Sequence, residues 1–266
     1  MAALFLILSK RRMKMGINEI KMEFKEASFD MLPDLILKYN SDERAGVVKL
    51  VAGAQKKLDA FEKEKERIHS MKEYEEKYKD CRYICGIDEV GRGPLAGPVV
   101  AAAVILPKDE DIYYLNDSKQ LSEKKRDALY EEIMEKAVAV GIGFADEKCI
   151  DEINILQADY EAMKIAISKL KYKPDVLLND AVIIPGVDIK QEKIIKGDTK
   201  SVSIAAASII AKVTRDRYMV EMDKKYPGYG FASNKGYGSE SHIKALKEIG
   251  PCDIHRRSFI GNFVDN

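Results

Sequence analysis

The chain has 266 residues, of which 46% are hydrophobic and 33% charged, enough to bury one sizeable core and a smaller second one. Its 44 Lys and Arg residues balance 44 Asp and Glu residues, so any affinity for a polyanion must come from uneven placement of charge. No apolar stretch reaches the roughly 18 residues that a membrane-spanning helix needs, which excludes that class of protein.

The cysteines and the start of the chain predict a cytoplasmic protein. Four scattered cysteines (Cys81, Cys85, Cys149 and Cys252) suit neither a disulfide framework nor a paired zinc site, which favours a reducing compartment. The apolar run 2–8 precedes the basic cluster 10–12, the reverse of a secretory signal. The same pattern is consistent with a true first residue at Met13 or Met15.

Residues 1–75 are expected to form a helical extension. Apolar residues recur at helical spacing from Ser41 to about Tyr78, which predicts a long amphipathic helix with Ser41 as its cap. Ile17–Phe24 and Met31–Tyr39 predict shorter helices, broken at Pro33. No catalytic motif is visible here, and a solvated appendage or docking arm is the simplest interpretation.

Residues 76–266 are expected to form an α/β domain whose mixed sheet is flanked by helices. Two strands joined by a tight turn come first, and strands then alternate with helices, which is typical of such a sheet. The predicted strands are 83–87, 99–106, 138–144, 176–178 and 193–195, and the predicted helices are 122–134, 154–170 and 203–225.

Four acidic residues follow apolar runs in this domain: Asp88, Glu89, Asp180 and Asp198. Any one of them alone would more simply be a solvated turn residue. If the strands are neighbours, however, the four share one pocket, and two bare carboxylates about 4 Å apart repel by roughly 4 kcal/mol at an effective dielectric of 20. No histidine is near them in sequence, so we expect a hard ion, Mg²⁺ or Mn²⁺, and phosphodiester chemistry with two ions.

The late part of the chain is basic. Residues 190–266 hold 14 Lys or Arg against 9 Asp or Glu. Clusters at Lys212, Arg215 and Arg217, at Lys224 and Lys225, and at Arg256 and Arg257 could follow a phosphate backbone. The rings of Tyr226, Tyr229, Phe231 and Tyr237 could stack on sugars or bases.

Five motifs, in order, resemble those of the bacterial ribonuclease HII family. They are Gly86–Pro98, Asn116–Leu121, Lys196–Asp216, Asn234–Gly238 and His255–Phe259. The resemblance covers about Tyr83 to Phe259, and the preceding helices are similar to an extension that some members carry. It implies a ribonuclease H-like fold and an endonuclease that acts on RNA–DNA hybrids and on duplex DNA containing ribonucleotides. We also expect a monomer.

The resemblance also implies roles for particular residues. Asp88, Glu89, Asp180 and Asp198 would be the catalytic carboxylates that hold Mn²⁺ or Mg²⁺. Gly91, Arg92 and Gly93 would read the ribose 2′-hydroxyl, and Tyr237 would pack on the following deoxyribose. The expected cut lies 5′ to a ribonucleotide and leaves a 3′-hydroxyl and a 5′-phosphate.

The sequence departs from the family pattern at two positions. Ala181 stands where the family usually has Gly, and Asn234 stands where many members have His.

Three other kinds of protein have to be weighed against the resemblance. A dinucleotide-binding loop fits poorly, because the turn contains Pro94 and leads into a strand. A docking protein built on the amino-terminal helices would lose its whole function with residues 1–75, whereas we expect the core to keep its activity. The Gly91-Arg92-Gly93 turn favours the ribonuclease HII family over the related ribonuclease HIII family.

Overall fold

The computed structural model describes residues 15–264. The chain forms two compact units divided between Arg67 and Ile68, whereas the sequence places the change between residues 75 and 76. The expectations for the apolar run 2–8, the basic cluster 10–12 and Met13 lie outside the described residues. No helix within 15–264 combines the length and the apolar character needed to cross a membrane.

The first unit is helical, as predicted. Its core is formed by Ile20, Phe24, Leu32, Tyr39, Val47 and Ala54. The long helix begins at Ala45 rather than after Ser41, and the segment before it contains a 2.6 Å ion pair between Arg44 and Asp42. The helical elements are α2 (Ile17–Glu26), η1 (Phe29–Met31), α3 (Leu32–Tyr39) and α4 (Ala45–Ser70).

The second unit contains a five-stranded mixed sheet, which confirms the predicted fold class. The strand order is β3-β2-β1-β4-β5, with β1–β2 and β2–β3 antiparallel and β1–β4 and β4–β5 parallel. The strands are β1 (Ile84–Val90), β2 (Val99–Ile105), β3 (Ala139–Ala145), β4 (Val176–Asp180) and β5 (Lys190–Ile194).

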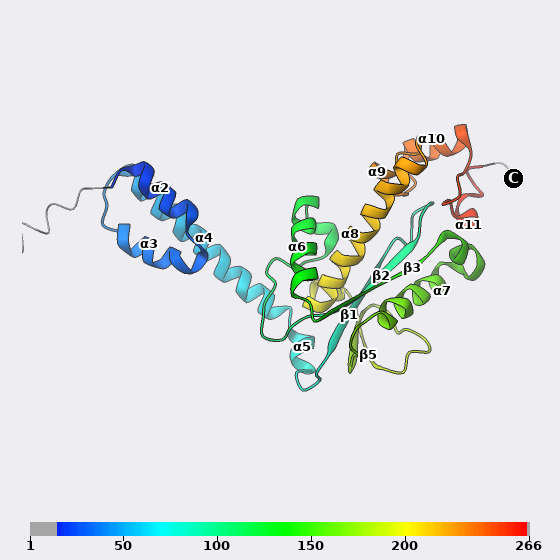
Figure 1. Ribbon diagram of the computed structural model, residues 1–266, viewed down its shortest axis with the longest axis horizontal. Coiled ribbons are helices and arrows are strands. Elements are labelled where there is room, and N and C mark those ends of the chain that lie inside the picture. The colour runs from blue at the N-terminus through cyan, green and yellow to red at the C-terminus, as the bar shows by residue number, and fades with distance from the viewer. Residues whose placement is uncertain (1–14, 265–266) are drawn as a thin grey trace, which may run out of the picture. The chain divides into compact units, whose positions relative to one another are not determined.

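Helices cover both faces of this sheet (Figure 1). Helix α8 packs on one face against β1 and β2, and α7 packs on the other against β2 and β3. The helical elements of the unit, in chain order, are α5 (Glu73–Lys77), η2 (Ser118–Gln120), α6 (Glu123–Lys136), α7 (Glu147–Ser168), η3 (Gly197–Thr199), α8 (Val202–Lys225), α9 (Phe231–Asn234), α10 (Glu240–Ile249) and α11 (Arg257–Ile260).

Glycines let both helices approach the sheet closely. A Cβ on Gly86 of β1 would stand 2.0 Å from the backbone carbon of Ser203 on α8, and one on Gly143 of β3 would stand 1.9 Å from the Ala162 carbonyl oxygen on α7. Any larger residue at either position would push the helix away from the sheet.

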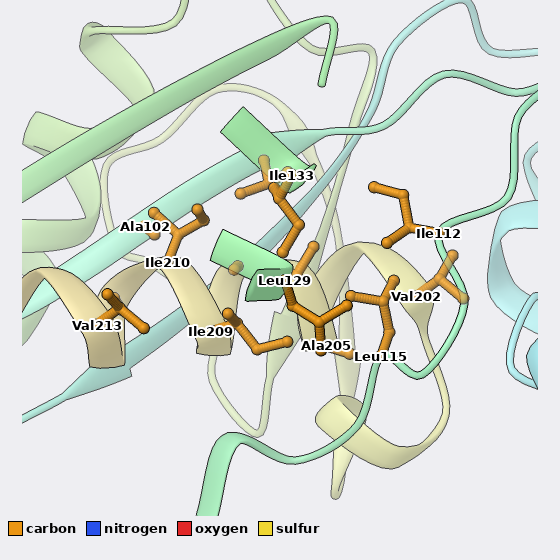
Figure 2. Close-up of a cluster of buried hydrophobic side chains, with 14 of the residues drawn as sticks. Ala102, Ile112, Leu115, Leu129, Ile133, Val202, Ala205, Ile209, Ile210 and Val213 are labelled. Carbon is orange, nitrogen blue, oxygen red and sulfur yellow. The ribbon is translucent and has the colours of Figure 1, made fainter. Parts of the chain in front are cut away.

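The core between α8, α6 and the sheet is continuous and apolar (Figure 2). The buried alanines of α8 allow close contact with the strands, while larger aliphatic side chains fill the space beneath α6. Labelled members of this cluster are Ala102, Ile112, Leu115, Leu129, Ile133, Val202, Ala205, Ile209, Ile210 and Val213.

Helix α7 corrects one predicted boundary. The sequence predicts a helix from Asn154, whereas α7 begins at Glu147 and is kinked at Asn154, whose φ is 68°. The Asn154 side-chain oxygen accepts hydrogen bonds from the backbone N–H groups of Leu156 and Gln157, at 3.0 and 3.2 Å. Asn154 therefore caps the second part of α7, which is why the local pattern indicates a helix start there.

Candidate active site

Two neighbouring parallel strands bring the first three carboxylates together. Asp88 and Glu89 lie within β1 rather than after it, and β1 runs between β2 and β4. The register pairs Ile87 with Asn179, so Asp180 at the end of β4 lies at the same level as Asp88. This is the edge where the carboxyl ends of parallel strands meet.

Asp88 and Glu89 point to opposite faces of the sheet, because successive residues of a strand alternate. Asp88 is 7% exposed and faces α8, where the Ser208 hydroxyl lies against it. Burial and then repulsion by Glu89 raise the pKa of Asp88 well above its usual value. Burial also raises the pKa of Glu89, and the Arg92 guanidinium partly opposes that shift.

The remaining carboxylate, Asp198, is attached to the same edge through Asp180. One Asp180 oxygen accepts a 2.7 Å hydrogen bond from the backbone N–H of Gly197, which joins the end of β4 to η3. Asp198 follows Gly197 and is half-buried. Its pKa is raised by burial and then by repulsion from Asp117 and Asp180. All four predicted carboxylates therefore lie at one edge of the sheet.

The Ala181 departure has a local structural consequence. Ala181 has a φ of 54°, in the left-handed region that glycine enters without steric cost. A residue with a Cβ pays roughly 1–2 kcal/mol for this conformation. The backbone after Asp180 therefore keeps the conformation that a glycine would favour, at a cost in stability.

Two buried arginines hold the glycine turn between β1 and β2. Arg256 donates to the carbonyl oxygens of Gly91, Arg92 and Gly97, at 2.5, 2.9 and 2.9 Å. Arg215 donates to the carbonyl oxygens of Pro98, Ala96 and Lys235. Both side chains are fully buried, so the prediction that they follow a phosphate backbone is wrong. They fix the turn instead.

Tyr237 lies beside this turn. The backbone N–H of Leu95 donates to the Gly236 carbonyl at 2.8 Å, and a Cβ on Gly93 would stand 3.9 Å from the Tyr237 ring. Tyr237 is 43% exposed, whereas Tyr229 and Phe231 are buried and stacked on each other. Of these three rings only Tyr237 is well placed to contact a ligand.

Sequence reasoning missed two acids near the site. Asp117 belongs to the Asn116–Leu121 motif, and that motif could have identified it as a residue near the site. Asp159, on α7, is fully buried among the apolar residues of that helix, and nothing local distinguishes it. Burial and then repulsion by Glu89 raise the pKa of Asp159 to about 8, against the opposing influence of Arg92.

The donor set suits a hard divalent cation. The acidic groups at this edge offer carboxylate oxygens, and one buried oxygen of Glu89 has no hydrogen-bond partner within the described chain. Asp88 and Asp180 each use one oxygen to accept from a backbone N–H. Among residues 15–264 no three acid, His or Cys side chains form a group that could hold an ion as they stand.

A mixed sheet with helices on both faces and carboxylates at the ends of its central strands defines a ribonuclease H-like protein. Two solved structures support this assignment. Ribonuclease H2 from Pyrococcus horikoshii OT3 is 29% identical, with a TM-score of 0.56 over 66% of this chain and 93% of that one. Ribonuclease HII in a complex with PCNA, from Archaeoglobus fulgidus, is 28% identical, with a TM-score of 0.57 over 69% and 97%.

The sequence comparisons are more specific. Residues 85–262 match the family model for ribonuclease HII, and residues 16–79 match the model for its N-terminal domain. Ribonuclease HII from Lachnoclostridium phytofermentans is 63% identical over 95% of this chain and 99% of its own length. Ribonuclease HII from Clostridioides difficile is 51% identical over 94% of this chain and 98% of its own length. The chain belongs to the ribonuclease HII family.

Membership settles the class of reaction. The chain is an enzyme, a metal-dependent nuclease among the hydrolases, and an endonuclease that acts on the RNA of RNA–DNA hybrids. The resemblance identified from five motifs is thereby confirmed.

Proposed function

We propose that this enzyme also cuts duplex DNA on the 5′ side of an embedded ribonucleotide and leaves a 3′-hydroxyl and a 5′-phosphate. The observation that carries the proposal is the position of the carboxylate edge beside the glycine turn and Tyr237. Glu89 and Arg92 are separated by only two residues, and the Arg92 guanidinium lies 3.6 Å from a Glu89 oxygen. The groups for chemistry and for sugar recognition thus share one surface.

Asp88, Glu89, Asp180 and Asp198 would hold two divalent ions, Mg²⁺ or Mn²⁺. When bound, such ions lower the pKa of an attacking water and stabilise the departing oxygen. The carboxylates provide the negative charge that attracts the ions. The raised pKa values of Asp88, Glu89 and Asp198 reflect burial and then repulsion by neighbouring carboxylates, a cost that a cation would relieve.

The glycine turn would recognise the ribose. Glycines at 91 and 93 let main-chain groups come close to a sugar, and the 2′-hydroxyl is the group that distinguishes RNA from DNA. The turn is rigid because Arg256 binds its carbonyl oxygens. Tyr237 would pack on the next deoxyribose. Arg92 would take part in reading the 2′-hydroxyl through its place in the turn, and its side chain would point to the phosphate backbone.

The Asp88→Asn variant tests this assignment. It should fail to cleave a DNA duplex bearing one ribonucleotide, yet bind that duplex about as well as the wild type does. The matched control is Asp109→Asn, which removes an exposed acid from a surface loop and should cut at the normal rate. Normal cleavage by Asp88→Asn would refute the carboxylate assignment, and equal cleavage of an all-DNA duplex would refute the reading of the 2′-hydroxyl.

The cytoplasmic location and the monomeric state stay predictions. The four cysteines are unpaired, which supports a reducing compartment. Size-exclusion chromatography with light scattering would test the monomer, and a dimer mass would contradict it.

A further inference from the structure

The buried carboxylate of Asp159 has one cationic neighbour. Its side chain is fully buried on α7, and neither of its oxygens has a hydrogen-bond partner in the described part of the chain. The one ion pair found for it there joins its Oδ2 to Nε of Arg92, at 3.7 Å. A buried acid without a partner is costly, so its position next to a guanidinium requires a reason.

Arg92 lies between two acids. Its Nη1 is 3.6 Å from Glu89 Oε1, its Nε faces Asp159, and 44% of its side chain is exposed. The Nη1 and Nε atoms of the guanidinium therefore face carboxylates, while the exposed part of the side chain can contact a ligand. An arginine held in this way loses less conformational entropy when it binds a phosphate.

The backbone of the turn does not depend on this pair. Arg256, which is fully buried, binds the carbonyl oxygens of Gly91 and Arg92. Among the described residues, the ion pair of Asp159 is with the Arg92 side chain and not with the backbone of the turn. Changing Asp159 should consequently move the guanidinium and leave the glycine turn in place.

Glu89 cannot be the permanent anchor of Arg92, because it is also a proposed metal ligand. A carboxylate committed to a cation interacts less with a guanidinium. Asp159 has no such second task, and its burial between α7 and the turn keeps it near Arg92 in either case.

We propose that Asp159 is a positioning residue that holds the Arg92 guanidinium at the glycine turn, oriented for a phosphate of the nucleic acid. What Arg92 binds rests on the proposed function. That Asp159 holds Arg92 does not, so the two are tested separately.

The first measurement needs no substrate. Carbon-detected ¹⁵Nε–¹³Cζ spectra of the arginine-labelled full chain, recorded at pH 9 where Asp159 is charged, report the environment of each guanidinium. Arg92→Gln assigns the signal. Asp159→Leu should shift and sharpen it, Asp159→Asn should shift it partway, and Glu152→Gln, an exposed acid on the same helix, should leave it unchanged. An Arg92 signal that is identical in wild type and both Asp159 variants would overturn the proposal.

The second measurement is binding to a duplex with one ribonucleotide, in EDTA and at the same pH 9, above the Asp159 pKa of about 8. Loss of one directed arginine contact predicts about fivefold weaker binding for Asp159→Leu, with a thermal midpoint no lower than that of the wild type. In the Arg92→Gln variant, adding Asp159→Leu should weaken duplex binding no further. If it weakens binding there about fivefold as well, Asp159 does not act through Arg92, and the proposal is overturned. If the wild type binds this duplex and an all-DNA duplex equally well, the proposed reading of the ribonucleotide fails. The arginine spectra still decide whether Asp159 holds Arg92.

Discussion

A buried pair of histidines makes stability depend on pH in a defined direction. His242 and His255 are 0% and 1% exposed, and their Nε2 atoms are 3.1 Å apart. His242 Nδ1 lies 2.8 Å from the Tyr237 carbonyl oxygen, which can only accept, so Nδ1 carries the proton and Nε2 accepts. His255 Nε2 must then donate to His242, and His255 Nδ1 accepts from the Cys252 backbone N–H at 3.0 Å.

This arrangement requires both rings to be neutral. Burial and then the neighbouring His242 lower the pKa of His255 from 6.5 to about 4. Between these values the unfolded chain binds a proton that the folded chain does not bind. Stability is therefore lost as pH falls from 6.5 to 4, and this difference in pKa corresponds to about 3 kcal/mol.

The His255→Gln variant isolates this contribution, since Gln keeps a donor toward His242 and does not titrate. Urea unfolding at several pH values between 7 and 4 should show that the advantage of the wild type over His255→Gln shrinks by about 3 kcal/mol. His69→Gln, which changes an exposed histidine, should follow the wild type at every pH. A difference between wild type and His255→Gln that does not change with pH would refute the neutral pair, as would NMR titration of His255 near pH 6.5.

Three further predictions concern stability and can be read from urea unfolding. Asp88→Asn removes a buried, repelled charge and should raise the free energy of unfolding at pH 7 by about 1 kcal/mol or more; a loss of stability would contradict the strain at the carboxylate edge. Ala181→Gly should gain about 0.5–1 kcal/mol, because glycine adopts the φ of 54° without steric cost; no gain would mean that the backbone there relaxes. Asn154→Ala should lose about 1–2 kcal/mol with the cap of α7, whereas Asn154→Gly should lose only a few tenths.

The fold and much of the site could be predicted because their signals are local. The apolar run of β1, the glycine turn and the alanine-rich α8 are each visible within a short stretch of sequence. Asp88 and Glu89 stood out because acids in an apolar strand are unusual. The mixed sheet followed from the order of the elements.

The errors arise where burial depends on distant parts of the chain. Arg215 and Arg256 look like phosphate contacts in sequence, yet the fold buries both of them against the carbonyl oxygens of the turn. Asp159 lies in a helix whose neighbouring residues are largely apolar. Only the packing of α7 in the fold brings it close to Arg92. Such contacts cannot be derived from local patterns, because they depend on the tertiary arrangement.

The most direct test of the whole account is to map the cut on a DNA duplex with one embedded ribonucleotide, labelled at either end. With Mg²⁺ or Mn²⁺ present, the account predicts a single cut 5′ to the ribonucleotide, with a 3′-hydroxyl on one fragment and a 5′-phosphate on the other. Excess chelator should abolish it. A cut elsewhere, or one that persists in the chelator, would contradict the claim that these carboxylates act through bound ions beside a ribose-reading turn.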